Sequence, residues 1–432
     1  MRCLSPLDGS WWVESTLMTT DALVPSRLAR ATATLFGGNL AALLLQIIQF
    51  VLLARLLGVT EFGHVAAANS LIAIAIPLAG LGYGNVLLMR VSRDRSRLRF
   101  DLGNSQFAIA IIGSVLVLAV TLIARGVYGS AAEIALIVTM AISELILVRS
   151  TVVLGQLYQA LDRIEMTSVL NTATALCRVS AVVLMLLLGR HDSLTWAMTS
   201  CSLMLLLVVV AHVITARRVG LPLLDLRRLW TDRADAAHFS LGIGAKALYT
   251  ELDKVVLARS AVAGELGAYT AAYRLVAMSF LPVRSLLDAS ASHFYRRGAE
   301  SLAQSYALAR QLLKVALPYG AVVAIAILAG AELVPYILGP SFESAVPMMR
   351  ALSILPLIQS VHYAFSDALT AAGLQSLRTR LQWTVAAIYA LVAIIVVPRF
   401  GWQGAVVVCL SCELLLAIFI VAAVRHCVRK AA

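Results

Sequence analysis

Two stretches of the sequence, 204 positions apart, resemble each other. Residues Val51–Ala73 read VLLARLLGVTEFGHVAAANSLIA, and residues Val255–Ala277 read VVLARSAVAGELGAYTAAYRLVA. They align without a gap and share the spacing of three residue types. These are Arg55, Glu61 and Gly63 in the first stretch, and Arg259, Glu265 and Gly267 in the second. Matches of Ala and Leu carry little weight in apolar sequence, so this spacing is the main signal, and it predicts an internal repeat.

The sequence around these stretches is too apolar for a soluble protein. Of 432 residues, 60% are hydrophobic and 13% are charged, whereas an average soluble protein is about 45–50% apolar and about 25% charged. This composition excludes a soluble globular domain and a disordered chain, and 6 Cys are too few for a disulfide scaffold. At about 20 residues per span, twelve spans use about 240 residues, which leaves no room for a large soluble catalytic domain.

Twelve apolar stretches are long enough to cross a membrane as helices. They fall at 31–54, 61–88, 102–124, 131–155, 166–188, 194–215, 238–259, 265–289, 311–330, 344–370, 381–398 and 402–424. About 22 Lys and Arg lie in the even-numbered loops and the two tails, against about five in the odd-numbered loops. By the positive-inside rule, both termini are therefore cytoplasmic.

The repeat and the spans together predict the architecture. We expect an all-α polytopic membrane protein, with twelve transmembrane helices in two six-helix lobes that share one orientation. The predicted segments are a cytoplasmic tail over 1–30, an N-lobe over 31–215, a linker over 216–237, a C-lobe over 238–424 and a tail over 425–432. Leucines alternate with charges in the linker, which favours a short interfacial helix on the cytoplasmic surface. The alternative is an unstructured loop.

Charged side chains inside the spans mark the candidate site, because a charge in hydrocarbon is costly unless it faces a cavity or pairs with another charge. The candidate substrate-binding residues are Arg149, Arg178, Lys246, Lys254 and Arg274. The candidate coupling or counter-ion residues are Asp253, Glu144 and Glu251. The set is slightly positive, and arginine can bind phosphate oxygens through two donors at once. The alternative role for these residues is in internal ion pairs that fix helix packing.

Signals for catalysis, metals and nucleic acids are weak. Cys409 and Cys412 form a C-x-x-C inside an apolar helix, where small packing residues are expected rather than zinc ligands. The sequence has no Walker A motif. Its basic residues lie between apolar spans, which argues against nucleic acid as a partner. We therefore predict a protein that is not an enzyme and has no cofactor or metal.

Several stretches together resemble the polysaccharide transporter branch of the MOP superfamily, the Wzx-type flippases of lipid-linked oligosaccharides. LLGVTEFGHVAAANSL (56–71) is similar to that family's first periplasmic turn, and ELDKVVLARSAVAGELGAYTAAYRL (251–275) to its seventh and eighth spans. LVPYILGPSFESAVPMMRALSILPL (333–357) resembles its ninth-to-tenth connection. Each motif alone consists mostly of small and apolar residues. The order of the motifs along nearly the whole chain is what makes the resemblance to this family specific.

The resemblance implies a flippase that moves undecaprenyl-pyrophosphate-linked oligosaccharide from the inner to the outer leaflet by alternating access. It implies the bacterial cytoplasmic (inner) membrane and a role in surface polysaccharide biosynthesis, such as lipopolysaccharide O-antigen or exopolysaccharide. The partners would be the lipid-linked oligosaccharide, membrane lipids, a polysaccharide polymerase and its chain-length machinery.

Two other functions stay open at this point. One is an ion-coupled exporter of drugs or small metabolites in the same superfamily. The absence of Asp and Glu from span one argues against its cation-exporting carriers. The other is a membrane-embedded polysaccharide polymerase or ligase, which would call for a long periplasmic loop, whereas the odd-numbered loops here are short.

Overall fold

The computed structural model describes residues 24–127 and 130–431, and within these residues all regular elements are helices. Most of the predicted N-terminal tail, residues 1–23, lies outside the described part. The first lobe, here the N-lobe, contains α1 to α7. Its elements are α1 (Val24–Ala75), η1 (Ile76–Leu78), α2 (Tyr83–Val91), η2 (Arg95–Arg97), α3 (Leu98–Val127), α4 (Ala131–Ile142), the π-helical turn η3 (Ser143–Val148), α5 (Arg149–Ala160), α6 (Ile164–Leu188) and α7 (Ser193–Val219).

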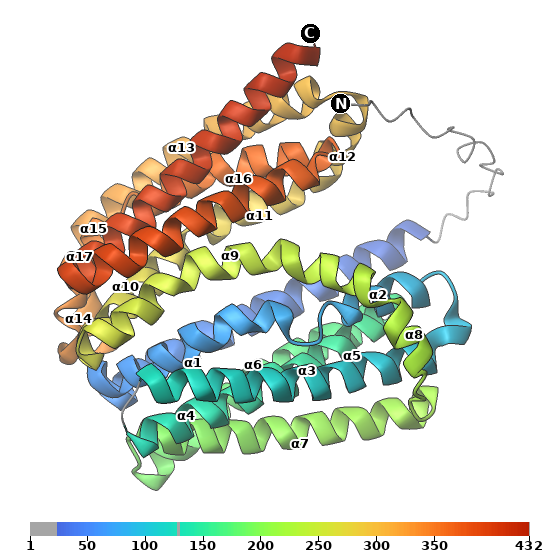
Figure 1. Ribbon diagram of the computed structural model, residues 1–432, viewed down its shortest axis with the longest axis horizontal. Coiled ribbons are helices and arrows are strands. Elements are labelled where there is room, and N and C mark those ends of the chain that lie inside the picture. The colour runs from blue at the N-terminus through green and yellow to red at the C-terminus, as the bar shows by residue number, and fades with distance from the viewer. Residues whose placement is uncertain (1–23, 128–129, 432) are drawn as a thin grey trace.

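The second lobe, here the C-lobe, contains α9 to α17 and follows the short helix α8 (Leu226–Thr231). Its elements are α9 (Arg233–Ser260), α10 (Ala263–Ser279), α11 (Leu281–Ala289), α12 (Ala291–Glu300), α13 (Leu302–Gly330), η4 (Ala331–Leu333), α14 (Val334–Leu338), η5 (Pro340–Phe342), α15 (Ala345–Ala351), α16 (Leu355–Ala371) and α17 (Gln375–Ala431). The two lobes meet where α1, α10 and α14 come together and are farther apart where α2, α8 and α12 lie (Figure 1). We call these the closed end and the open end.

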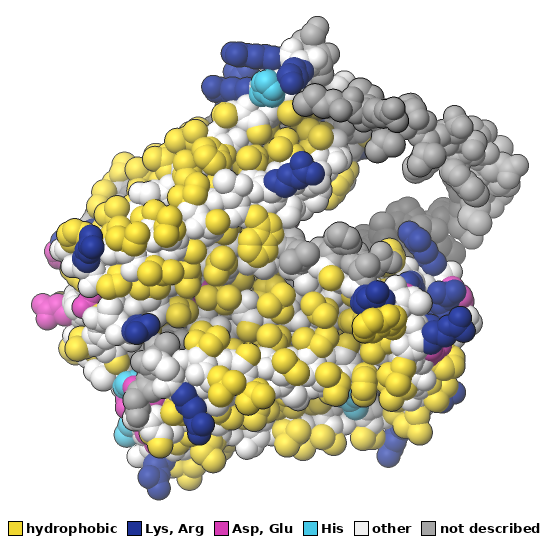
Figure 2. All heavy atoms as spheres, in the orientation of Figure 1, with side chains coloured by type: hydrophobic (Ala, Val, Ile, Leu, Met, Phe, Trp, Pro, Cys, Tyr) yellow, Lys and Arg dark blue, Asp and Glu magenta, His cyan; other side chains and the backbone are white. Residues whose placement is uncertain are grey.

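The helices have the lengths and surfaces of membrane spans. Seven helical segments of the described residues are long and apolar enough to cross a membrane. Figure 2 shows hydrophobic side chains over most of one broad face, with Lys and Arg mostly toward its ends. The predicted fold class, an all-α membrane protein of two lobes, is confirmed, while the count of twelve helices and their orientation stay predictions.

Two of these seven segments each contain a break between two predicted spans. Gly58 in α1 has φ 70° and Gly401 in α17 has φ 55°. Both angles lie in the left-handed region that glycine adopts without strain. The breaks separate the predicted first span from the second and the eleventh from the twelfth.

Helix ends differ from the predicted domain boundaries. Helix α1 begins at Val24 rather than at residue 31, α9 begins at Arg233 rather than at 238, and α17 continues to Ala431. Apolar composition marks the part of a helix suited to hydrocarbon, whereas the helix itself continues through flanking polar residues. The sequence therefore indicates where the apolar part of each helix begins and ends, and not where the helix itself does.

The predicted linker does contain a short helix, α8, which docks on the N-lobe at the open end. The Asp225 side chain accepts a hydrogen bond from the backbone N–H of Arg228 and caps this helix. The Tyr83 hydroxyl donates to the Leu229 carbonyl at 2.7 Å, and Arg90 forms an ion pair with Asp232. Trp230 is 68% exposed on α8. Its contact with a membrane surface stays a prediction.

The repeat is visible as a reciprocal contact between the lobes. A Cβ atom on Gly63 would lie 1.8 Å from the Ala263 carbonyl oxygen, and one on Gly267 would lie 2.1 Å from the Val59 carbonyl oxygen. Val59 and Ala263 are themselves equivalent positions of the repeat. When residue i contacts j and the equivalent of j contacts the equivalent of i, the two units are related by a two-fold axis. At the closed end the lobes thus pack backbone against backbone about such an axis.

The repeated glutamates have equivalent partners. Glu61 accepts a hydrogen bond from the backbone N–H of Ser193 at 3.0 Å, where the last helix of the N-lobe begins. Glu265 accepts one from the backbone N–H of Trp402 at 2.7 Å, where the helix after Gly401 begins. Each glutamate therefore ties the start of the second predicted span of its lobe to the start of the last.

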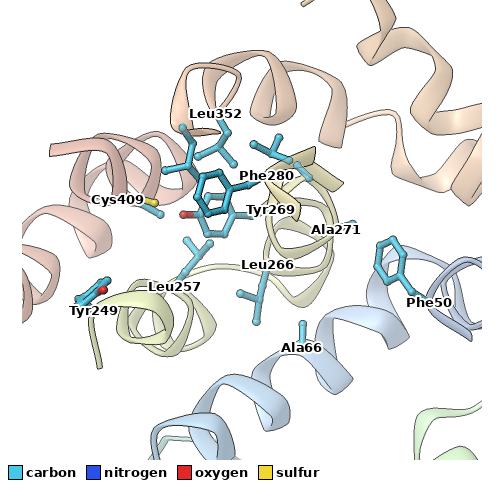
Figure 3. Packing of buried hydrophobic residues seen from close by; sticks show 14 of the residues in the cluster. Phe50, Ala66, Tyr249, Leu257, Leu266, Tyr269, Ala271, Phe280, Leu352 and Cys409 are labelled. Atoms are coloured by element: carbon cyan, nitrogen blue, oxygen red, sulfur yellow. The ribbon is translucent and has the colours of Figure 1, made fainter. Parts of the chain in front are cut away.

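The main hydrophobic core surrounds α10. Figure 3 shows Tyr269 of α10 close to Leu352 and Cys409 of the C-lobe, while Phe50 and Ala66 lie on α1. All five residues belong to one buried cluster, so the core continues from the C-lobe across to the N-lobe. This packing holds α10 in place, and α10 carries one residue of the candidate site.

Candidate substrate-binding site

A large cavity of the N-lobe lies between α1, α5 and α6. Its volume is about 520 Å³. Asn171, Thr174 and Arg178 of α6 line it, spaced three and four residues apart, with Gln46 of α1 opposite. Residues at this spacing share one face of a helix. One polar face of α6, which corresponds to the predicted fifth span, therefore lines a cavity.

A second cavity shares the lining residue Arg178 with the first and lies where the two lobes meet. Glu144, Arg178 and Arg274 line it together with Gln49 and Asn69 of α1. Its volume is about 70 Å³. The Arg274 side chain comes from α10 of the C-lobe, so this small cavity contains charged groups from both lobes.

The cavity arginines differ in their partners. The Arg178 guanidinium donates to the Glu144 carboxylate at 2.5 Å, and about a fifth to a quarter of each side chain remains exposed. Glu144 lies in the π-helical turn η3, a distortion often found at functional sites. The Arg274 guanidinium lies 5.8 Å from the centre of the Phe50 ring, within the range of a cation–π interaction.

A third cavity contains Arg149 and adjoins the first at Val152. It has a volume of about 80 Å³ and lies beside Gln156 and Asn85, whose side-chain amides are hydrogen-bonded at 2.9 Å. The three cavities therefore follow one another along the N-lobe and bring together three of the five candidate cationic residues. Among the described residues that line them, Glu144 is the one carboxylate, so the lining has a net positive charge.

The remaining candidates lie elsewhere. Lys254 and Asp253 are buried in the C-lobe, with 2% and 1% of their surface exposed. The Lys254 Nζ lies 3.5 Å from Asp253 Oδ1 and 3.6 Å from Glu251 Oε2. It also lies 4.0 Å from the centre of the Tyr273 ring, and the Tyr269 hydroxyl donates to Asp253 at 2.5 Å. This cluster has the form of an internal ion pair, the alternative role set out for these residues.

Lys246 is exposed and lies apart from that cluster. Its Nζ is 5.0 Å from the centre of the Tyr363 ring. Arg284 approaches the same ring at 5.4 Å and is also paired with Asp367 at 3.4 Å. Lys246 is absent from the lining of the three N-lobe cavities.

The sequence did not reveal a second buried charged pair in the C-lobe. His362 of α16 lies 2.8 Å from Glu413 of α17, and both are almost fully buried. Glu413 was visible as a carboxylate in an apolar span, but the residue that pairs with it is 51 positions away on another helix. Only the packing of α16 against α17 reveals the pair.

Among the described residues, no three or more His, Cys, Asp or Glu side chains are arranged to hold a metal ion. Cys409 and Cys412 are both buried in α17. Their surroundings are those of packing residues.

One family matches the sequence: the polysaccharide biosynthesis protein family, over residues 28–285. That range is more than half of the chain. The chain belongs to this family. No curated protein matches it.

Solved structures of the MOP superfamily share the fold of this family member. A multidrug resistance MATE family transporter in an inward-facing conformation has 16% identity and a TM-score of 0.70 over 90% of this chain and 96% of its own. The lipid II flippase MurJ, in an inward closed conformation, has 11% identity and a TM-score of 0.71 over 90% of this chain and 87% of its own. A MOP superfamily transporter from Pyrococcus furiosus has 14% identity and a TM-score of 0.62 over 93% and 95%.

The family match confirms the predicted polysaccharide family, and the solved structures confirm that the chain has the fold of MOP superfamily transporters. The neighbours are transporters and a flippase, in agreement with the prediction that the chain is not an enzyme. The protein is thus a multi-pass membrane protein with a transporter fold.

Proposed function

We propose that this protein is a flippase that moves an oligosaccharide linked to undecaprenyl pyrophosphate from the inner to the outer leaflet of the bacterial cytoplasmic membrane. It would act in the biosynthesis of a surface polysaccharide, such as an O-antigen or an exopolysaccharide. The observation that carries the proposal is the row of cavities along the N-lobe with Arg149, Arg178 and Arg274 in its lining.

The chemistry of this row suits a pyrophosphate. Two linked phosphates present several anionic oxygens, and each guanidinium offers donors in a planar fork that matches them. The site has three guanidinium groups and one carboxylate, so it keeps a positive charge after the pairing of Arg178 with Glu144. The side-chain amide of Asn171 and the hydroxyl of Thr174 offer hydrogen bonds to sugar hydroxyls in the cavity of about 520 Å³.

Alternating access would move the cargo. The lobes are in contact at the closed end and apart at the open end, where α8 lies. With both termini in the cytoplasm, the open end faces the cytoplasm, where the lipid-linked oligosaccharide is made. Rocking about the closed end would expose the arginines to the other side while the lipid tail stays in the bilayer. Polymerase and chain-length proteins would act on the product.

A drug or metabolite exporter is the second candidate, favoured by the fold shared with a multidrug transporter. The charge of the site separates the two candidates. For the Pyrococcus furiosus transporter, reversed polarity of the binding pocket suggests a different function. The same argument applies to this chain, because a positively charged lining disfavours cationic drugs and favours an anionic headgroup.

The decisive experiment is mass spectrometry of polyprenyl-linked sugars in a strain that lacks the gene, with an assay of surface polysaccharide. We expect a complete repeat unit to accumulate on the lipid while the surface glycan is lost. An unchanged lipid-linked pool with intact surface glycan, in a strain without a second flippase, would refute the proposal and favour the exporter.

Variants of the arginines test the site. We expect Arg178→Ala or Arg274→Ala to reduce complementation of that strain about 10-fold or more, the loss for a charged contact of at least about 1.4 kcal/mol. Arg350→Ala is the matched control, because Arg350 is exposed and pairs with the exposed Glu332. All three variants should reach the membrane in equal amounts. Normal complementation by both cavity variants would show that the site lies elsewhere.

A further inference from the structure

We infer that the cavity beside Arg149 is a phosphate subsite, in which the glycine turn before α2, Arg149 of α5 and Ser240 of α9 together bind one phosphate of the lipid-linked cargo. The inference rests on the proposed function, because that function supplies a lipid diphosphate. It deepens that function by separating the place of the phosphate from the cavity of about 520 Å³, and it adds a residue of the C-lobe to the site.

The glycine turn, residues 79–84 between η1 and α2, lines the cavity with backbone donors that have no partner. Gly80 and Gly82 have positive φ angles of 82° and 76°. Left-handed Gly82 adjoins right-handed Tyr83 in a turn, a backbone form in which neighbouring N–H groups make a concave anion-binding nest. The N–H groups of Gly82 and Gly84 make no hydrogen bond within the described residues. Gly80, Gly82 and Gly84 all line the cavity.

Contacts on several sides hold this turn in shape. The Ser105 hydroxyl donates to the Tyr83 carbonyl at 3.2 Å, and the Tyr83 hydroxyl donates to the Leu229 carbonyl at 2.7 Å. A Cβ atom on Gly84 would lie 2.0 Å from Gln156 Oε1, so only glycine lets α5 approach the start of α2 this closely. Donors that are already fixed in place bind a ligand without the cost of ordering them first.

Arg149 is a cavity arginine that makes no hydrogen bond or ion pair within the described residues. By contrast, Arg178 is bound by Glu144, and Arg274 lies near the Phe50 ring. The Arg149 side chain is only partly exposed, and none of the described residues that line its cavity is a carboxylate. A charge within a span is costly unless it is paired or faces a cavity. An anionic ligand fits this position, because a guanidinium donates to two oxygens of one phosphate.

Ser240 supplies an independent sign of a ligand at the same cavity. It is 2% exposed, its hydroxyl makes no hydrogen bond within the described residues, and it lines the cavity. Buried polar groups are nearly always satisfied, so this hydroxyl lacks an acceptor that a ligand can supply. Ser240 lies on α9, where Ala236 packs against Tyr83 and Val86 of α2. The subsite is therefore complete only while the start of α9 lies against α2.

The donors and acceptors of the lining suit a phosphate better than a sugar. The lining offers a guanidinium, two backbone N–H groups, a hydroxyl and the side-chain N–H₂ of Asn85. The Asn85 Oδ1 atom already accepts from the Gln156 amide at 2.9 Å. Donors thus outnumber free acceptors. An ionised phosphate only accepts hydrogen bonds, whereas each sugar hydroxyl also donates one.

The size and position of the cavity favour the cargo over a phospholipid as the source of that phosphate. Its volume of about 80 Å³ is several times the roughly 10–15 Å³ that admits one water, which leaves room for a phosphate group. Both this cavity and the cavity of about 520 Å³ are lined by Val152, and Asn171 and Thr174 line the latter. A sugar diphosphate on a lipid has a group for each cavity, whereas a phosphatidylglycerol has no sugar for the second.

The test measures lipid binding to the purified full chain in non-ionic detergent by native mass spectrometry. The probe is undecaprenyl diphosphate. Undecaprenol has the same chain without phosphate, and phosphatidylglycerol has a phosphate without the polyprenyl chain. We expect the unmodified protein to bind undecaprenyl diphosphate about 10-fold or more tightly than either of the other two, the factor expected of charge-assisted hydrogen bonds.

Variants of the subsite should remove this preference. We expect Ser240→Ala and Arg149→Gln each to weaken the binding of undecaprenyl diphosphate about 10-fold and to leave the binding of undecaprenol unchanged. The matched control is Ser168→Ala. Ser168 is 4% exposed and its hydroxyl also has no partner within the described residues, but it lines none of the three cavities. This control should bind all three lipids as the unmodified protein does.

Thermal unfolding separates a ligand contact from a structural role of Ser240. Without lipid, Ser240→Ala should unfold at the same temperature as the unmodified protein or at a higher one, because it removes a buried hydroxyl that has no partner. Undecaprenyl diphosphate should raise the unfolding temperature of the unmodified protein more than that of Ser240→Ala. A Ser240→Ala variant that loses stability without lipid and binds undecaprenyl diphosphate normally would overturn the inference.

Other outcomes would overturn the subsite and leave the proposed function intact. If Arg178→Ala weakened binding while Ser240→Ala and Arg149→Gln bound normally, the phosphate would lie in another cavity. If phosphatidylglycerol bound as tightly as undecaprenyl diphosphate and responded equally to Ser240→Ala, the cavity would hold a phospholipid headgroup instead of the cargo. A protein that complements the deletion strain without preferring undecaprenyl diphosphate to undecaprenol would also refute the subsite. Failure of the proposed function would instead appear as an unchanged lipid-linked pool in the strain that lacks the gene.

Discussion

The N-lobe and the C-lobe share one scheme at the closed end but differ in where they place their charges. At the closed end, Gly63 and Gly267 make reciprocal contacts, and Glu61 and Glu265 accept equivalent hydrogen bonds. In the membrane-spanning part, Arg149 and Arg178 of the N-lobe line cavities together with Arg274 of the C-lobe, whereas Lys254–Asp253 and His362–Glu413 are pairs buried among the helices of the C-lobe. The two lobes are thus alike in their contacts at the closed end and differ in where their charged side chains lie.

This difference indicates that the two groups of charged residues have different roles. Charges that line a cavity are available to a ligand, and they cost little because water or the ligand surrounds them. Charges that are buried and paired contribute to binding only indirectly, but their protonation acts strongly on packing, because an unpaired charge in that setting is costly. We therefore expect the cavity arginines to contact the cargo and the buried pairs of the C-lobe to hold its helices together.

The largest expected effect comes from breaking a buried pair of the C-lobe. Lys254→Met leaves Asp253 and Glu251 without their cation, and we expect a loss of about 3–5 kcal/mol in the free energy of unfolding. Thermal unfolding of the purified protein in detergent, followed by size-exclusion chromatography, measures this loss.

Two companion variants make this test a comparison of the lobes. Arg178→Met breaks the Arg178–Glu144 pair of the N-lobe, but Glu144 remains open to the cavity, so the loss of stability should be much smaller. Adding Asp253→Asn to Lys254→Met should restore part of the stability. Equal losses for the Lys254 and Arg178 variants would contradict the proposed difference between the lobes.

A smaller loss of stability is expected for substitutions at the closed end. Gly63→Ala and Gly267→Ala each place a methyl group within about 2 Å of a carbonyl oxygen of the other lobe. Because the contact is reciprocal, we expect the two variants to cost similar amounts, about 1–3 kcal/mol each. The same thermal assay measures the cost. Gly126→Ala is the control, since an added Cβ there meets no atom within 4 Å. A large loss of stability for only one of the two glycine variants would show that the two contacts, although related by the two-fold axis, do not contribute equally to stability.

The sequence predicted the fold well because span length and the repeat are local signals. The spacing from Arg55 to Gly63, repeated from Arg259 to Gly267, predicted the two lobes. Helix ends were less accurate, since α1 and α9 continue through polar residues that hydropathy does not count.

The candidate site could be predicted only in part, because sequence shows depth in a span but not the direction a side chain faces. Asn171, Thr174 and Arg178 are three and four residues apart in the sequence, which places them on one face of a helix, and the structure shows that this face lines a cavity. Asp253 and Lys254 have similar depth, yet they point into packed helices. The His362–Glu413 pair joins two helices, and no pattern within either helix indicates its partner.

The smallest expected effect is a difference in stability loss between variants of the two repeated glutamates, Glu61 and Glu265. Helix α7 has a cap of its own, because the Asp192 side chain accepts from the backbone N–H of Thr195 at 2.7 Å. Glu61 therefore supplies a second acceptor there, whereas Glu265 is the side-chain acceptor seen at the start of the helix after Gly401.

Loss of an N-terminal cap costs about 0.5–2 kcal/mol. We accordingly expect Glu265→Ala to lie near the upper end of that range and Glu61→Ala near the lower, measured by the same unfolding assay. Asp192→Ala combined with Glu61→Ala should then raise the cost in the N-lobe to the level of Glu265→Ala alone. If the two single variants lost equal amounts of stability, the two glutamates would contribute equally to the helix starts that they cap. Asp192 would then add nothing to the start of α7.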